Sequence, residues 1–133
     1  MNAQLESIAQ QTLSLSGSAS ATIFVVTRTG ALSLAAAAGV DGPALDRLVG
    51  AVQSPEHPVA RTAADGHADF DVTPIAPGGP ALRSHVPLIK RDGTDSVVGV
   101  LAVAHQAALT ADQRRALFEL ADQAAEFAAD ERE

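Results

Sequence analysis

The strongest constraint on the fold is a run of eight residues, VVGVLAVA at 97–104, that contains no polar side chain. Successive side chains of a strand point to opposite faces of its sheet, so a strand built from this run is apolar on both faces. Such a strand belongs in the middle of a sheet that is covered on both sides. The run is too short to cross a membrane, which needs about 20 apolar residues.

The residues before this run predict its partner strand. Residues 82–89, LRSHVPLI, alternate between two faces, and RDGTDS at 91–96 provides a turn between the two strands. Pro87 cannot donate a hydrogen bond to a neighbouring strand, so it marks a strand edge or a bulge. The sequence therefore predicts an antiparallel hairpin whose second strand is central.

Periodicity and turn residues predict the other elements. Leu5, Ile8 and Thr12 have helical spacing in the first 16 residues, and Thr110 with Gln113 has the spacing of a capping box before the last helix. The β-branched run ATIFVVTR and residues 31–40 predict two strands, although the alanines of the second favour a helix. Early prolines open two short helices at 41–53 and 57–66, and Gly66 is expected to cap the second.

Residues 67–81 are expected to form a loop with a brief strand around 68–71, because this stretch contains three prolines and two glycines. A loop of that length in a compact domain is typical of a lid or a binding loop.

Together these elements predict one α+β domain over residues 1–133. It has an N-terminal helix at 1–16, a central antiparallel sheet with inserted helices at 20–105, and a C-terminal helix at 110–130. We expect the terminal helices on one face, and the short helices and the loop on the other. A sheet face roofed by short helices and a loop favours a pocket.

Composition excludes several functions. The chain has no cysteine, so disulfides, thiolate zinc sites and cysteine nucleophiles are excluded, which suits a cytoplasmic protein. A formal charge of −7 and 3% aromatic residues disfavour nucleic acid and anionic membranes as partners. No nucleophile–base pair is recognisable, and the spacing of the four histidines matches no metal motif. We therefore expect neither enzymatic activity nor a cofactor.

The sharpest site hypothesis is an anion site. Arg83 and His85 share one strand face, and Arg61 lies on the short helix expected to roof that face. Phe70, Val72 and Ile75 are expected to form an apolar lid over the ligand. The alternatives are a strand face exposed to water and loop residues that only anchor the loop to the core.

The terminal helices predict a homodimer. Phe118 lies about 100° around the helix from Leu117, so the last helix has apolar residues beyond one core face. The predicted interface residues are Leu5, Ile8, Leu117, Phe118 and Phe127. The alternative is a last helix packed between the sheet and the first helix.

The order of these elements resembles GAF domains. Residues 84–128, SHVPLIKRDGTDSVVGVLAVAHQAALTADQRRALFELADQAAEFA, contain a small-plus-Pro-Leu strand, a turn, a Gly-Val-Leu strand and a long Leu/Ala helix. HPVARTAADG is similar to the short helix that precedes the lid region in that family. The resemblance extends from about residue 5 to 129 and is carried by pattern rather than by a chemical motif.

This resemblance implies a GAF/PAS-like sensory or regulatory domain that binds a small molecule and acts through dimerisation or a separate signalling protein. The cysteines that attach bilins or reduce methionine sulfoxide in the family are missing here. The cyclic-nucleotide signature is not recognisable, and a histidine alone does not establish haem binding. The alternative is a scaffold for dimerisation or protein interaction that binds no ligand, either a degenerate GAF domain or a roadblock-like module.

Overall fold

The computed structural model describes residues 3–72, 82–91 and 95–131. Its elements, in chain order, are α1 (Ala3–Ser16), β1 (Ser20–Val26), β2 (Leu32–Ala38), α2 (Gly42–Ala51), α3 (Pro58–Asp65), β3 (Asp69–Val72), β4 (Leu82–Lys90), β5 (Ser96–His105) and α4 (Ala111–Glu131). The predicted helices and strands are therefore confirmed, whereas most of the predicted loop, 73–81, lies outside the described residues.

The five strands form one antiparallel sheet in the order β2-β1-β5-β4-β3. The apolar strand β5 is central, and every residue from Val98 to His105 is buried. Pro87 is tolerated in β4 because the short edge strand β3 pairs with β4 only at Arg83 and His85. Beyond His85, β4 has β5 as its strand neighbour.

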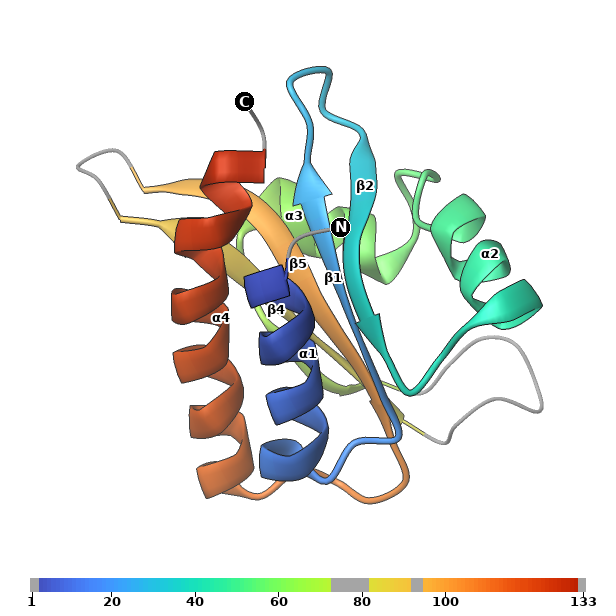
Figure 1. Cartoon of the computed structure of the whole chain (residues 1–133), viewed down its shortest axis with the longest axis vertical. Helices are drawn as coiled ribbons and strands as arrows, with labels where there is room; N and C mark the ends of the chain where they lie inside the picture. The colour runs from blue at the N-terminus through green and yellow to red at the C-terminus, as the bar shows by residue number, and fades with distance from the viewer. Residues whose placement is uncertain (1–2, 73–81, 92–94, 132–133) are drawn as a thin grey trace.

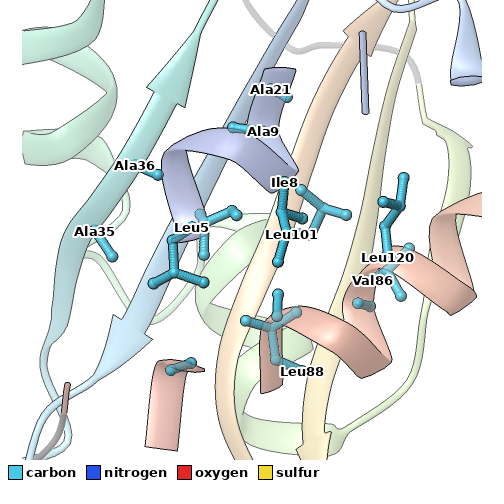
Figure 2. Close-up of a cluster of buried hydrophobic side chains, with 14 of the residues drawn as sticks. Leu5, Ile8, Ala9, Ala21, Ala35, Ala36, Val86, Leu88, Leu101 and Leu120 are labelled. Carbon is cyan, nitrogen blue, oxygen red and sulfur yellow. The ribbon is translucent and has the colours of Figure 1, made fainter. Parts of the chain in front are cut away.

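The terminal helices cover one face of this sheet. Figure 1 shows α1 and α4 side by side in front of the strands. Figure 2 shows Leu5 and Ile8 of α1, Leu120 of α4, and Leu88 and Leu101 of the sheet, which belong to one buried apolar cluster. The alanines of β2 fit this layer because their small side chains let α1 approach the sheet closely; Ala35 and Ala36 belong to the same buried cluster.

The opposite face is covered more thinly. In Figure 1, α3 lies behind the sheet, while α2 lies beside the edge strand β2. A smaller apolar cluster forms here, and its buried members are Phe24, Leu32, Val52, Val59, Val100 and Ala102. No residue of α2 itself is buried, although Val52 directly after it is.

Local contacts fix the ends of the helices. Thr110 N–H donates to Gln113 Oε1 over 2.8 Å, and Gln113 N–H donates to Thr110 Oγ1 over 3.1 Å, which confirms the capping box at the start of α4. Gly66 ends α3 in the left-handed conformation with φ of 72°, as expected for a C-terminal glycine cap.

Three of the predicted dimer residues lie inside the protomer. Leu5 and Leu117 are fully buried, and Ile8 is 4% exposed, because α1 and α4 use these side chains to cover the sheet. They therefore leave no surface for a second chain, contrary to the expectation. Phe118 is exposed and Phe127 is partly buried against the core.

Candidate functional site

A small cavity lies between α3 and the thinly covered face of the sheet. Its volume is about 20 Å³, and a cavity of that size holds about one water molecule. On the sheet side, β1 and β5 contribute small residues such as Thr22 and Ala102, and β4 contributes Arg83 and His85; the helix side includes Leu48 and His57. Small side chains on β1 and β5 leave this space open beneath α3.

His85 is the most unusual residue of the cavity wall. It is 2% exposed, and its Nδ1 atom is buried without a hydrogen-bond partner. Burial, together with the smaller effects of the charges of His57, Arg83 and Arg61, lowers the pKa of His85 to about 4. The ring is therefore neutral at neutral pH and offers one donor and one acceptor nitrogen.

His57 brings a second imidazole to the cavity. It is the N-cap residue of α3, and its Nδ1 accepts a hydrogen bond of 3.1 Å from Val59 N–H. Burial lowers the pKa of His57, with contributions from Arg83 and Arg61. In the neutral ring the proton is on Nε2, because Nδ1 accepts, so Nε2–H is left as a donor.

The charge around the cavity is positive. Arg83 lines it, and Arg61 of α3 is close enough to act on both histidines. Within the described part of the chain, neither arginine forms an ion pair. Asp69 stands opposite His85 in the strand register, but it neither lines the cavity nor bonds to His85.

The structure thus brings together part of the predicted anion site. Arg83 and His85 line the cavity, and Arg61 is exposed beside it. Val72 pairs with Arg83 across the strands without lining the cavity. Ile75 lies outside the described residues.

Phe70 lies on the opposite face, contrary to the expectation of a lid. Its ring packs 5.6 Å from the ring of Phe118, centroid to centroid, and the Arg114 guanidinium lies 4.8 Å above it. Asp69 pairs with His85 and shares its face, so Phe70, the next residue, takes the other face by ordinary alternation. An irregularity follows at Asp71, which has a positive φ of 58°, and Val72 then pairs with Arg83. Because an extra residue shifts the alternation, Phe70 and Val72 do not share a face although they are two positions apart.

A second polar cluster, which the sequence analysis did not predict, lies on the terminal-helix face. His105 Nδ1–H donates to the Ala107 carbonyl over 2.8 Å, so in the neutral ring Nε2 accepts from the Ser84 hydroxyl, also at 2.8 Å. Ser84 Oγ in turn accepts from Asp71 N–H over 3.0 Å. We call Ser84, His105, Asp71 and Arg114 the polar bridge.

Asp71 ties this bridge to the start of α4. Its Oδ1 accepts from Leu109 N–H over 3.0 Å, and its Oδ2 lies 2.7 Å from Arg114 Nη2. Burial alone would raise the pKa of Asp71, but the hydrogen bonds from Leu109 and Arg114 outweigh it and the pKa is lowered.

The polar bridge lacks the arrangement of a Ser-His-Asp triad. Ser84 is fully buried and His105 is 1% exposed, so no substrate reaches the hydroxyl. In a triad the carboxylate orients the nitrogen that does not face the serine. Here Asp71 lies 3.9 Å from Nε2, the same nitrogen that faces Ser84. The arrangement connects β3, β4, β5 and α4 rather than activating a nucleophile.

The described residues hold no group of three or more potential metal ligands. Of the helices that the structure describes, none has the length and apolar character to cross a bilayer.

Solved structures identify the fold. The second GAF domain of DevS from Mycobacterium smegmatis superposes with a TM-score of 0.71 at 23% identity, over 95% of this chain and 91% of that one. The GAF domain of a phosphoenolpyruvate-protein phosphotransferase from Acinetobacter gives a TM-score of 0.72 at 19% identity, over 94% and 80%. The chain has the GAF fold.

One of the solved structures that match this chain is an enzyme. A type II free methionine-R-sulfoxide reductase from Thermoplasma acidophilum superposes with a TM-score of 0.75 at 14% identity, over 96% of this chain and 91% of that one. No protein-family model and no curated protein sequence matches the chain. The GAF fold is thus recognised here through structure, in agreement with the resemblance seen in the sequence.

Proposed function

We propose that this chain is a cytoplasmic sensory or regulatory domain that binds a small molecule in the cavity beneath α3 and has no catalytic activity. The observation that carries the proposal is His85, a buried ring that lines the cavity and has one nitrogen without a hydrogen-bond partner. A buried polar atom without a partner costs about 1–3 kcal/mol, and a ligand that bonds to it recovers part of that cost.

A ligand larger than a water molecule needs more room than the cavity provides. The element best able to move is α2, because none of its residues is buried. Leu48 of α2 lines the cavity, so displacing α2 would widen it directly. The ligand would shift the population toward this wider state by binding it more tightly than the closed state.

The polar bridge offers a route from the cavity to α4. Arg83, Ser84 and His85 are consecutive in β4, and their side chains alternate between the cavity and the bridge. A ligand that repositions Arg83 or His85 moves the backbone on either side of Ser84. Ser84 contacts Asp71, which holds the first turn of α4 through Arg114.

The output would be read from the outer surface of the terminal helices. Phe118 of α4 is 45% exposed and Leu15 of α1 is 53% exposed, and both are large apolar residues facing solvent. We propose that these residues, rather than Leu5, Ile8 and Leu117, contribute to a homodimer or to the contact with a separate signalling protein.

Two-dimensional NMR of the histidine rings tests the ligand proposal. A collection of metabolites is screened for compounds that shift the His57 and His85 signals but not those of exposed His67. At least one compound should do so and also change amide hydrogen exchange at the start of α4. If no compound shifts either ring, the ligand proposal is refuted.

A scaffold that binds no ligand is the second candidate. The observation in its favour is the cavity volume of about 20 Å³, which holds about one water molecule. A scaffold would form the same dimer in every condition and show no ligand-dependent change in α4.

A further inference from the structure

We propose that the cavity beneath α3 is a site for one small oxyanion, a carboxylate or an inorganic oxyanion such as nitrate or phosphate, held by Arg83 and Arg61 together with the rings of His57 and His85. This inference rests on the proposed function, because it names the chemical class of that ligand.

Charge is the first argument. Two guanidinium groups lie at or beside one small cavity, and within the described ranges no carboxylate forms an ion pair with either. The chain as a whole carries a net charge of −7, so this local excess of positive charge runs against its overall composition. An unpaired arginine at a partly desolvated site favours an oxyanion, because its donors match two oxygen atoms at once.

The available hydrogen-bond donors are the second argument. His57 Nδ1 is occupied by Val59 N–H, which leaves Nε2–H to donate. His85 Nδ1 has no partner, and a neutral ring can place its proton there. Both rings therefore offer an N–H to the same ligand. An oxyanion accepts such bonds at several lone pairs, whereas an ammonium group cannot accept any.

Size is the third argument. The cavity holds about one water molecule, and its walls include the small side chains of Thr22 and Ala102. An oxyanion of three to five heavy atoms needs only a modest enlargement, which an outward movement of α2 could provide because none of its residues is buried, whereas a nucleotide is many times larger. The cavity thus favours a small anion over an extended ligand.

The test titrates the full chain with formate, acetate, nitrate and phosphate, with chloride at matched ionic strength as the control. The NMR signals of His57, His85 and exposed His67 are followed together with the melting temperature. We expect at least one oxyanion to shift the two cavity histidines with saturation, and His67 to stay unchanged. Carboxylates and inorganic oxyanions form separate arms, so the preferred arm identifies the source of the anion.

Arginine variants supply the matched controls. Arg83→Gln should weaken oxyanion binding at least tenfold, and Arg61→Gln should weaken it less, because Arg61 is exposed on α3. Arg28→Gln removes an exposed arginine between β1 and β2 and should leave the affinity unchanged. Circular dichroism and the melting temperature of each variant without ligand confirm that it folds.

The possible failures are distinguishable. Equal shifts with chloride, or equal affinity for wild type and Arg83→Gln, would overturn the oxyanion site. If oxyanions leave His85 unchanged while a neutral or cationic metabolite shifts it with saturation, the oxyanion inference is refuted and the ligand-binding function stands. If neither class shifts His85, both proposals fall.

Discussion

Ser84 and His85 are adjacent in β4, yet their side chains lie on opposite faces of the sheet and take part in different polar clusters. His85 lines the cavity beneath α3, whereas Ser84 is 2.8 Å from His105 Nε2 in the polar bridge. One strand of the GAF fold therefore connects a candidate ligand site to the first turn of the C-terminal helix.

Removing the Ser84 hydroxyl should destabilise the domain. Ser84→Ala leaves His105 Nε2 and Asp71 N–H without their partner, and an unsatisfied buried polar group costs about 1–3 kcal/mol. Urea unfolding followed by circular dichroism measures this change. Ser33→Ala removes an exposed strand serine and should change the free energy of unfolding by less than about 0.5 kcal/mol. Equal effects of the two substitutions would show that the polar bridge does not stabilise the fold.

Asp71 should make stability depend on acidic pH. Because the pKa of Asp71 is lowered in the folded protein, its ionised carboxylate contributes fully to the free energy of unfolding above the unfolded pKa, about 3.9. This contribution is lost as the pH falls through the pKa of the folded protein. Asp71→Asn tolerates the positive φ and should cost about 1–2 kcal/mol at pH 7. The difference from wild type should shrink toward pH 3, whereas Asp69→Asn, which alters no bond of the bridge, serves as control. A pH-independent difference would contradict this role.

His85 should make the fold less stable at mildly acidic pH. Its pKa is lower in the folded protein than in the unfolded chain, the reverse of the order for an ion-paired histidine. Its folded pKa of about 4 lies below the ordinary 6.5, so the unfolded chain binds a proton first and stability falls as the pH drops from 6.5 toward 4. This protonation should lower the free energy of unfolding by about 2 kcal/mol when the pH falls from 7.5 to 5. His85→Gln should remove that part of the pH dependence in unfolding experiments, whereas His67→Gln should preserve it. An unchanged profile in the His85 variant would disprove the assignment.

A methyl group at Gly99 should be poorly tolerated. There β5 approaches β1 so closely that a Cβ would collide with the carbonyl oxygen of Phe24. Gly99→Ala should cost at least about 1–3 kcal/mol, the usual effect of overpacking. Gly50→Ala in α2 meets open space and should be neutral or stabilising by up to about 1 kcal/mol. Thermal unfolding of both variants measures these effects. A Gly99→Ala protein as stable as wild type would contradict this close packing of the two strands.

Leu117 and Phe118 should respond differently to truncation. Leu117 is fully buried, and replacing it with alanine should lower the free energy of unfolding by about 2–5 kcal/mol. Phe118 is half exposed, so Phe118→Ser should affect assembly more than folding. Sedimentation measures assembly for both variants. A Phe118→Ser protein with unchanged mass, next to a dimeric wild type, would exclude Phe118 from the interface.

Much of the fold was predictable because it depends on local periodicity. The apolar run in β5 required a central strand, and the turn before β2 outweighed the helical preference of its alanines. Tertiary pairing overrides propensity in such short segments.

The functional surfaces were harder to predict because they depend on local irregularity and on long-range contacts. Phe70 and Val72 take opposite faces because of the irregular register of β3, which no alternation pattern contains. The polar bridge joins residues up to 43 positions apart. Its one local signal was Ser84, a polar residue on the same strand face as the core residues Val86 and Leu88.

The most direct test of a ligand site at His85 is a crystal structure of the full chain grown with formate or nitrate, compared with one grown with chloride alone. We expect an oxyanion within hydrogen-bonding distance of His85 Nδ1 and the Arg83 guanidinium, with α2 displaced outward. A cavity that holds only water in both crystals, or an Arg83 side chain paired with Asp69 in both, would contradict this expectation.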